Sequence, residues 1–137
     1  MNTNNYSCDH IGILSNNAER LIKFYKTNLG FRLISAENLS SNIVKKLFKV
    51  NTTCCFYRLK FEDLLLEIFQ PHKKIKKLYS NKCNGIHHFG LRVQNRELFI
   101  KHLRGKKVKI ITIKRNERKI YFIKDPDGNI IEIREAR

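Results

Sequence analysis

Asp9-His10-Ile11-Gly12-Ile13, near the start of the chain, is repeated as His87-His88-Phe89-Gly90-Leu91 in the second half. Each copy is an extended apolar run in which a histidine is followed two residues later by glycine. Each half also ends in an apolar run that contains a single carboxylate, Glu67 in the first half and Glu132 in the second. The repeat therefore predicts two similar modules, each with one histidine and one glutamate.

Strand parity predicts which way these four side chains point. Alternate residues of a strand face opposite sides of a sheet. This alternation puts each histidine and each glutamate on the face opposite to its apolar neighbours. A strand carboxylate left unpaired among Leu and Ile would cost on the order of several kcal/mol. We therefore expect a divalent metal ion, which would remove that cost, bound by His10, Glu67, His88 and Glu132.

Composition and charge narrow the class of protein. The 137 residues are 42% hydrophobic, which fits one domain with a core, and no run of about 18 apolar residues predicts a membrane span. The first residues lack the features of a signal peptide, so we expect a cytoplasmic protein. The 28 basic and 12 acidic residues give a net charge of +16, which suggests an anionic substrate or nucleic acid. Because the lysines are scattered over expected helices and loops, we interpret most of the charge as a solvated face and disfavour nucleic acid.

The cysteines carry little functional signal in the sequence. Their positions fit no zinc-binding spacing, and free thiols in a reducing compartment are the simpler interpretation for Cys8, Cys54, Cys55 and Cys83. Cys8 shares a face with His10 and is a weak candidate for a fifth ligand. The histidines outside the two ligand positions are expected to be structural or exposed.

Apolar spacing predicts the same order of elements in both halves. In the first half, a strand, a helix and three strands are expected at residues 8–14, 18–29, 31–36, 54–61 and 64–69, with an ambiguous short helix within 39–50. In the second half the same order is expected at residues 86–93, 95–104, 108–113 and 118–124, with a last strand after the turn at 125–129. Asn17 is the expected N-cap of the first helix, and Gly30 is expected to end it.

The predicted fold class is therefore α+β. Two tandem βαβββ modules, residues 8–70 and 85–135, would form an eight-stranded curved sheet around a metal cleft, with the helices outside. Residues 71–84 would be a basic linker, and residues 1–137 a single domain.

These motifs together resemble the vicinal oxygen chelate superfamily. Its members include glyoxalase I, methylmalonyl-CoA epimerase, fosfomycin-modifying thiol transferases, extradiol dioxygenases and bleomycin-binding proteins. The resemblance covers residues 8 to 135 and is carried by the two histidine motifs, Leu29-Gly30-Phe31 and Asp125-Pro126-Asp127-Gly128-Asn129. It implies the same four metal ligands and a homodimer, with the cleft built either within one chain or across two.

The resemblance also implies a reaction. Glu67 matches glyoxalase I, whereas the epimerase has Gln there; Leu14 and the segment 70–72 depart from glyoxalase I, and the linker looks closer to the epimerase. The expected function is a metal-dependent lyase or isomerase of the glyoxalase I type, in which a divalent ion stabilises an enediolate or enolate. Glu67 or Glu132 would be both ligand and base.

The metal and the substrate stay open at this point. Mixed His and Glu ligands suit Zn, Ni, Co, Mn or Fe. Arg92, on the same face as His88, is the candidate to bind a small anionic substrate such as a thiol conjugate or a CoA thioester. The alternatives are an epimerase-like isomerase, a thiol transferase or dioxygenase of the same fold, and a metal-free drug-binding module.

Overall fold

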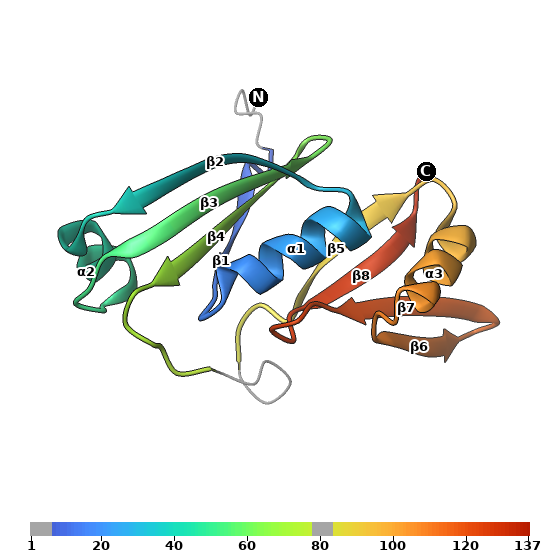
Figure 1. Cartoon of the computed structure of the whole chain (residues 1–137). Coiled ribbons are helices and arrows are strands. Elements are labelled where there is room, and N and C mark those ends of the chain that lie inside the picture. Colours follow the sequence, from blue (N-terminus) through green and yellow to red (C-terminus); the bar gives the residue numbers. More distant parts are fainter. Residues whose placement is uncertain (1–6, 78–83) are drawn as a thin grey trace, which may run out of the picture. The chain divides into compact units, whose positions relative to one another are not determined.

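The computed structural model describes residues 7–77 and 84–137. The chain divides into two compact units, one ending at Ile75 and one beginning at Lys76 (Figure 1). Part of the expected basic linker, including Cys83, lies outside the described residues. None of the helices within the described ranges is long and apolar enough to cross a membrane.

The first unit is a four-stranded sheet with two helices. Along the chain its elements are β1 (His10–Leu14), α1 (Ala18–Leu29), β2 (Arg32–Leu39), α2 (Ser41–Phe48), β3 (Cys54–Phe61) and β4 (Leu64–Pro71). The strand order in the sheet is β1-β4-β3-β2. β1 and β4 are parallel, and the other neighbours are antiparallel.

The second unit repeats this architecture without an equivalent of α2. Its elements are β5 (His88–Val93), α3 (Arg96–Gly105), β6 (Ile110–Arg115), β7 (Arg118–Lys124) and β8 (Ile130–Glu135). The strand order, β5-β8-β7-β6, again places a parallel pair at one edge. The predicted α+β class with two tandem βαβββ modules is confirmed, with the strands hydrogen-bonded as two four-stranded sheets.

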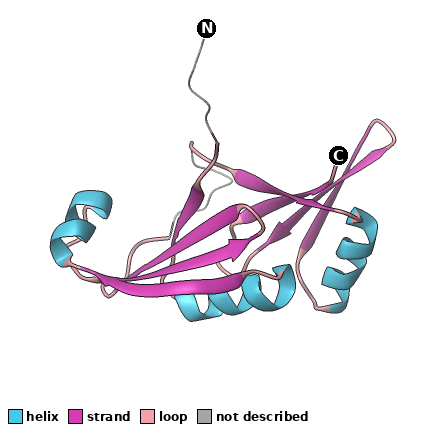
Figure 2. Ribbon diagram, turned by 90° about the horizontal axis from the view of Figure 1, so that it is seen from above, coloured by secondary structure: helices cyan, strands magenta, loops and turns pink. Residues whose placement is uncertain are grey.

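α1 and α3 each cover one face of the sheet of their own unit (Figure 2). In the first unit the Gln70 side chain, on β4, accepts a hydrogen bond from the backbone N–H of Ala18 at the start of α1 at 2.7 Å. In the second unit the Tyr121 hydroxyl, on β7, donates to Glu97 of α3 at 2.9 Å. The faces toward the helices therefore carry the fully buried aliphatic residues of the strands, Leu59, Leu66, Ile68, Ile123, Ile131 and Ile133.

The predicted boundaries of α1 are confirmed by its caps. The Asn17 side chain accepts a hydrogen bond from the Arg20 backbone N–H at 3.1 Å, which satisfies one of the free donors of the first turn. Gly30 ends the helix in the left-handed conformation, with φ of 78°. A side chain there would be strained, and its Cβ would lie 3.4 Å from the Phe61 ring.

Gly30→Ala is expected to lower the free energy of unfolding by about 1 to 2 kcal/mol, because a residue with a Cβ is disfavoured in the left-handed conformation. Urea unfolding measures the change. Gly105→Ala is the matched control, because Gly105 ends a helix, has no positive φ, and has open space around its Cβ position. Equal stability of the two variants would contradict this account of the α1 C-terminus.

Candidate metal centre

The parallel edge of the first sheet brings a histidine and a glutamate together. In the register of β1 and β4, Gly12 lies opposite Glu67, and His10 is two residues before Gly12. The His10 Nε2 atom is 3.4 Å from Glu67 Oε2. A Cβ at Gly12 would lie 3.5 Å from the Phe69 ring.

The charge of Glu67 is compensated within the sheet. Its side chain is only 10% exposed, and an unpaired carboxylate at such a position would be costly. Arg58 lies directly opposite on β3 and its Nε donates to Glu67 Oε1 at 3.2 Å. One oxygen of the carboxylate therefore contacts arginine and the other contacts histidine.

A neighbouring carboxylate orients His10. The Nδ1 atom lies 2.8 Å from Asp9 Oδ2, which leaves Nε2 facing Glu67. The hydrogen bond to Asp9 raises the pKa of His10, and the Glu67 carboxylate raises it further. A carboxylate on the second ring nitrogen is the usual partner of a metal-binding histidine, because it fixes the tautomer and makes the ligating nitrogen more basic.

The second unit repeats the arrangement. His88 Nε2 is 3.6 Å from Glu132 Oε2, and Gly90 lies opposite Glu132 in the register of β5 and β8. Arg134 Nη1 is 3.5 Å from Glu132 Oε1. The Nδ1 atom of His88 lies 3.0 Å from Nδ1 of His87, so Nε2 is again the nitrogen that faces the glutamate.

Within each pair, the two donor atoms have the spacing expected of two ligands of one divalent ion. Two ligands of one tetrahedral ion, each at about 2.0 to 2.2 Å, lie about 3.3 to 3.6 Å apart. The observed N–O distances of 3.4 and 3.6 Å match that separation. The donor set, two imidazoles and two carboxylates, suits zinc or a first-row transition metal.

The structure thus brings the predicted residues together in pairs, with His10 next to Glu67 and His88 next to Glu132. Among the described residues no three potential ligands form one cluster, so the convergence of all four stays a prediction. Arg92 is exposed on β5, and its register partner on β8 is Arg134.

Neither Arg58 nor Arg134 was predicted from the sequence to contact a glutamate of the site. The expected strands at 54–61 and 64–69 leave two residues for a tight turn, and a hairpin closed there pairs Arg58 with Glu67, as observed. Arg134 could have been found from parity, since it lies two residues after Glu132 on the same face. The sequence alone leaves open whether such a strand arginine points into the site or into solvent.

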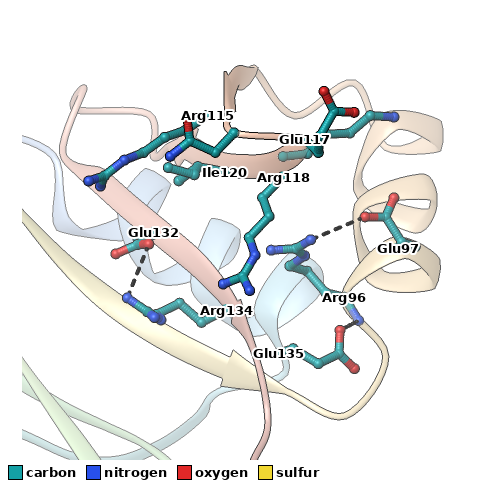
Figure 3. Close-up of a pocket in the computed structure, with 11 residues that line it drawn as sticks. Arg96, Glu97, Arg115, Glu117, Arg118, Ile120, Glu132, Arg134 and Glu135 are labelled. Atoms are coloured by element: carbon teal, nitrogen blue, oxygen red, sulfur yellow. Dashed lines mark hydrogen bonds and ion pairs between the residues drawn. The ribbon is translucent and has the colours of Figure 1, made fainter.

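An open cavity of about 1020 Å³ lies beside Glu132 in the second unit (Figure 3). Its charged lining residues are Arg96, Arg115, Arg118, Lys119, Arg134, Glu97, Glu117, Glu132 and Glu135. Three of the carboxylates have partners within the cavity wall: Glu97 is 3.5 Å from the Arg96 guanidinium, Glu132 is 3.5 Å from Arg134 Nη1, and Glu135 accepts from the Arg96 backbone N–H at 2.9 Å. The cavity therefore offers cationic groups to an anion near the candidate metal ligand.

The two modules and their His–Glu pairs define a class of protein. The model of the Glyoxalase/Bleomycin resistance protein/Dioxygenase superfamily matches residues 7–133. The chain belongs to this superfamily, and the predicted resemblance is confirmed. No curated protein matches the chain.

Solved structures show the same fold at low sequence identity. A glyoxalase family protein from Enterococcus faecalis is 21% identical with a TM-score of 0.71, covering 93% of this chain and 95% of its own. The trypanothione-dependent glyoxalase I of Leishmania major is 19% identical with a TM-score of 0.69, covering 96% and 87%. A fosfomycin resistance protein from Listeria monocytogenes is 13% identical with a TM-score of 0.61, covering 100% and 94%.

Arg58→Gln is expected to lower the free energy of unfolding of the metal-free protein by about 1 to 3 kcal/mol, because it removes the charged partner of a largely buried carboxylate. Urea unfolding in the presence of a chelator measures the loss. Adding Zn²⁺ should recover part of it, since a cation at Glu67 replaces the lost charge.

Lys60→Gln is the control for this experiment. Lys60 is an exposed residue of the same strand, and its loss should change stability by no more than about 0.5 kcal/mol. If the two variants are equally stable without metal, Arg58 does not compensate Glu67.

Proposed function

We propose that the protein is a metal-dependent lyase or isomerase of the glyoxalase I type, with one divalent ion bound by His10, Glu67, His88 and Glu132. The observation that carries the proposal is the repeated geometry of the two pairs. In each, the histidine Nε2 lies at ligand spacing from a glutamate oxygen, while Nδ1 is held by a neighbouring side chain. Two such pairs at repeat-equivalent positions are hard to explain as isolated core histidines.

In this proposal the metal ion, the two glutamates and the two arginines have different roles. The bound ion would supply Lewis-acid polarisation of substrate oxygens. Glu67 or Glu132 takes a proton from the substrate carbon and returns it to another atom or face. Arg58 and Arg134 each contact one oxygen of a glutamate and help to orient the carboxylate toward the histidine.

The cavity supports a small anionic substrate. Arg118 and Arg134 both line it, and Arg134 contacts Glu132, so a carboxylate or phosphate group bound to Arg134 would lie near the reacting centre. Arg92 stays a candidate for a second contact. A thiol conjugate and a CoA thioester both satisfy this charge requirement. The proposed working form is a cytoplasmic homodimer.

Metal titration separates the proposed site from the alternatives. Purified metal-free protein is expected to bind one divalent ion per chain by calorimetry, and His10→Ala or His88→Ala should each weaken binding about 100-fold or more. His102→Ala, on the exposed surface of α3, is the control. Two ions per chain would mean that each His–Glu pair binds its own ion. Activity with Fe(II) alone would favour a dioxygenase. No metal binding would favour the drug-binding module.

Mixed dimers show whether the site is built within one chain or across two. His10→Ala and His88→Ala proteins, inactive alone, are unfolded together and refolded as a mixture. If one module of each chain forms a site with the other chain, a mixed dimer contains one intact site and activity returns. If each site lies within one chain, every site in the mixture lacks a ligand and no activity returns.

Glu67→Gln separates the two roles of that residue. If Glu67 is the base, the variant should keep its metal and lose turnover by about 100-fold or more. The assays are conversion of the methylglyoxal–glutathione hemithioacetal and epimerisation of methylmalonyl-CoA, each with and without metal. Full activity after removal of metal would overturn the proposed function.

A further inference from the structure

A second cluster of reactive side chains lies in the first unit, away from the metal pair. The Sγ atom of Cys55 on β3 is 3.4 Å from Nε2 of His72, which follows the end of β4. Nδ1 of the same imidazole lies 2.7 Å from the hydroxyl of Thr53. Thiol, imidazole and hydroxyl therefore form a continuous row of hydrogen-bonding groups.

The position of His72 is fixed from two sides. Its backbone N–H donates to the Thr53 carbonyl at 2.9 Å, and its ring contacts the hydroxyl of the same residue. A hydroxyl oxygen that accepts from Nδ1–H selects the tautomer in which Nε2 keeps its lone pair. That lone pair then faces the Cys55 thiol and can take its proton.

Two further groups surround the sulfur. The Cys55 thiol also faces an acceptor, the Asn38 side-chain oxygen on β2, to which it donates at 3.6 Å. Burial first, and a hydrogen bond to Cys55 second, raise the pKa of the Tyr57 hydroxyl, which therefore remains a protonated donor beside the sulfur. A donor at that place stabilises negative charge on a thiolate.

The adjacent cysteine provides a contrast. Cys54 is fully buried, and burial raises the pKa of its thiol to about 11. It has no histidine partner among the described residues and points to the opposite face of the sheet. Cys55 is partly exposed, and His72 and Thr53 are exposed, so a small reagent can reach the row.

The row is separate from the metal pair. Cys55 shares its face with Leu59 and lies opposite Gln70, whose side chain contacts the start of α1. Arg58 and Glu67 are on the other face of the same sheet. The chemistry of Cys55 is thus independent of the proposed metal-dependent reaction.

We propose that Cys55 is a modification site for small disulfides, with His72 as the base and Thr53 as the residue that positions it. The Cys55 proton passes to His72 Nε2, and the sulfur attacks one sulfur of the disulfide RSSR. The S–S bond breaks, and the leaving thiolate takes the proton from His72. The products are a Cys55 mixed disulfide and one thiol RSH, so the small disulfide is the oxidant.

The test uses the full chain carrying Cys8→Ser and Cys83→Ser, so that only Cys54 and Cys55 remain. The probe is bis(2-hydroxyethyl) disulfide, which is neutral and therefore not attracted by the basic protein. The rate of adduct formation at pH 7 is followed by intact mass, and fragmentation mass spectrometry locates the adduct. We expect one adduct per chain, on Cys55, and none after Cys55→Ser.

Substitutions of the row test the roles of its members. His72→Ala should slow the reaction about tenfold or more, because the base is lost. Thr53→Val should slow it by a smaller factor, and Thr53→Ser, which keeps the hydroxyl, should retain the original rate. His102→Ala, an exposed histidine of the other unit, is the matched control and should leave the rate unchanged.

Two results would overturn the proposal. One is an adduct on Cys54 in place of Cys55. The other is an equal rate with and without His72 in proteins whose circular dichroism and thermal unfolding are unchanged. If His72→Ala unfolds the protein, the comparison of Thr53→Val with Thr53→Ser tests the proposal by itself. Equal reaction rates for these two variants would then overturn the proposed roles of His72 and Thr53.

Discussion

The parallel pairing of the first and last strands of each module is the contact on which the candidate site depends. His10 and Glu67 lie far apart in the sequence, near the two ends of the first unit. The register of β1 and β4 nevertheless brings their side chains within 3.4 Å. The pairing of β5 and β8 does the same for His88 and Glu132. A parallel pair needs a long crossover, and here the helix and two antiparallel strands between the paired strands supply it.

This pairing also creates an electrostatic problem that the sheet solves locally. A glutamate on a central strand is surrounded by apolar neighbours, and its charge has little access to water. Each module places a guanidinium on one oxygen of the glutamate and an imidazole on the other. The arginine comes from the neighbouring strand in the first unit and from the same strand in the second. The two units thus compensate the charge of the glutamate with arginines from different positions in the sheet.

Much of the fold could be predicted from the sequence because its signals are local. The spacing of apolar residues, the cap at Asn17 and the left-handed glycine at Gly30 fixed α1 at the residues observed. Strand ends were less accurate: β2 continues to Leu39 because β3 offers partners along that length. Parity correctly assigned the ligand candidates to the face away from the helix. Parity contains no information about which strands are neighbours, so the pairing of each histidine with its glutamate needed the structure.

The arginine contacts have a consequence for the denticity of the two glutamates. Arg58 and Arg134 contact the Oε1 atoms, while the His–Glu contacts are made by Oε2. A glutamate whose Oε1 stays on its arginine would give a metal one oxygen rather than two. Four protein ligands that each give one donor atom would satisfy an ion that takes four ligands, so a substrate oxygen could bind only by raising the coordination number or by displacing one of them.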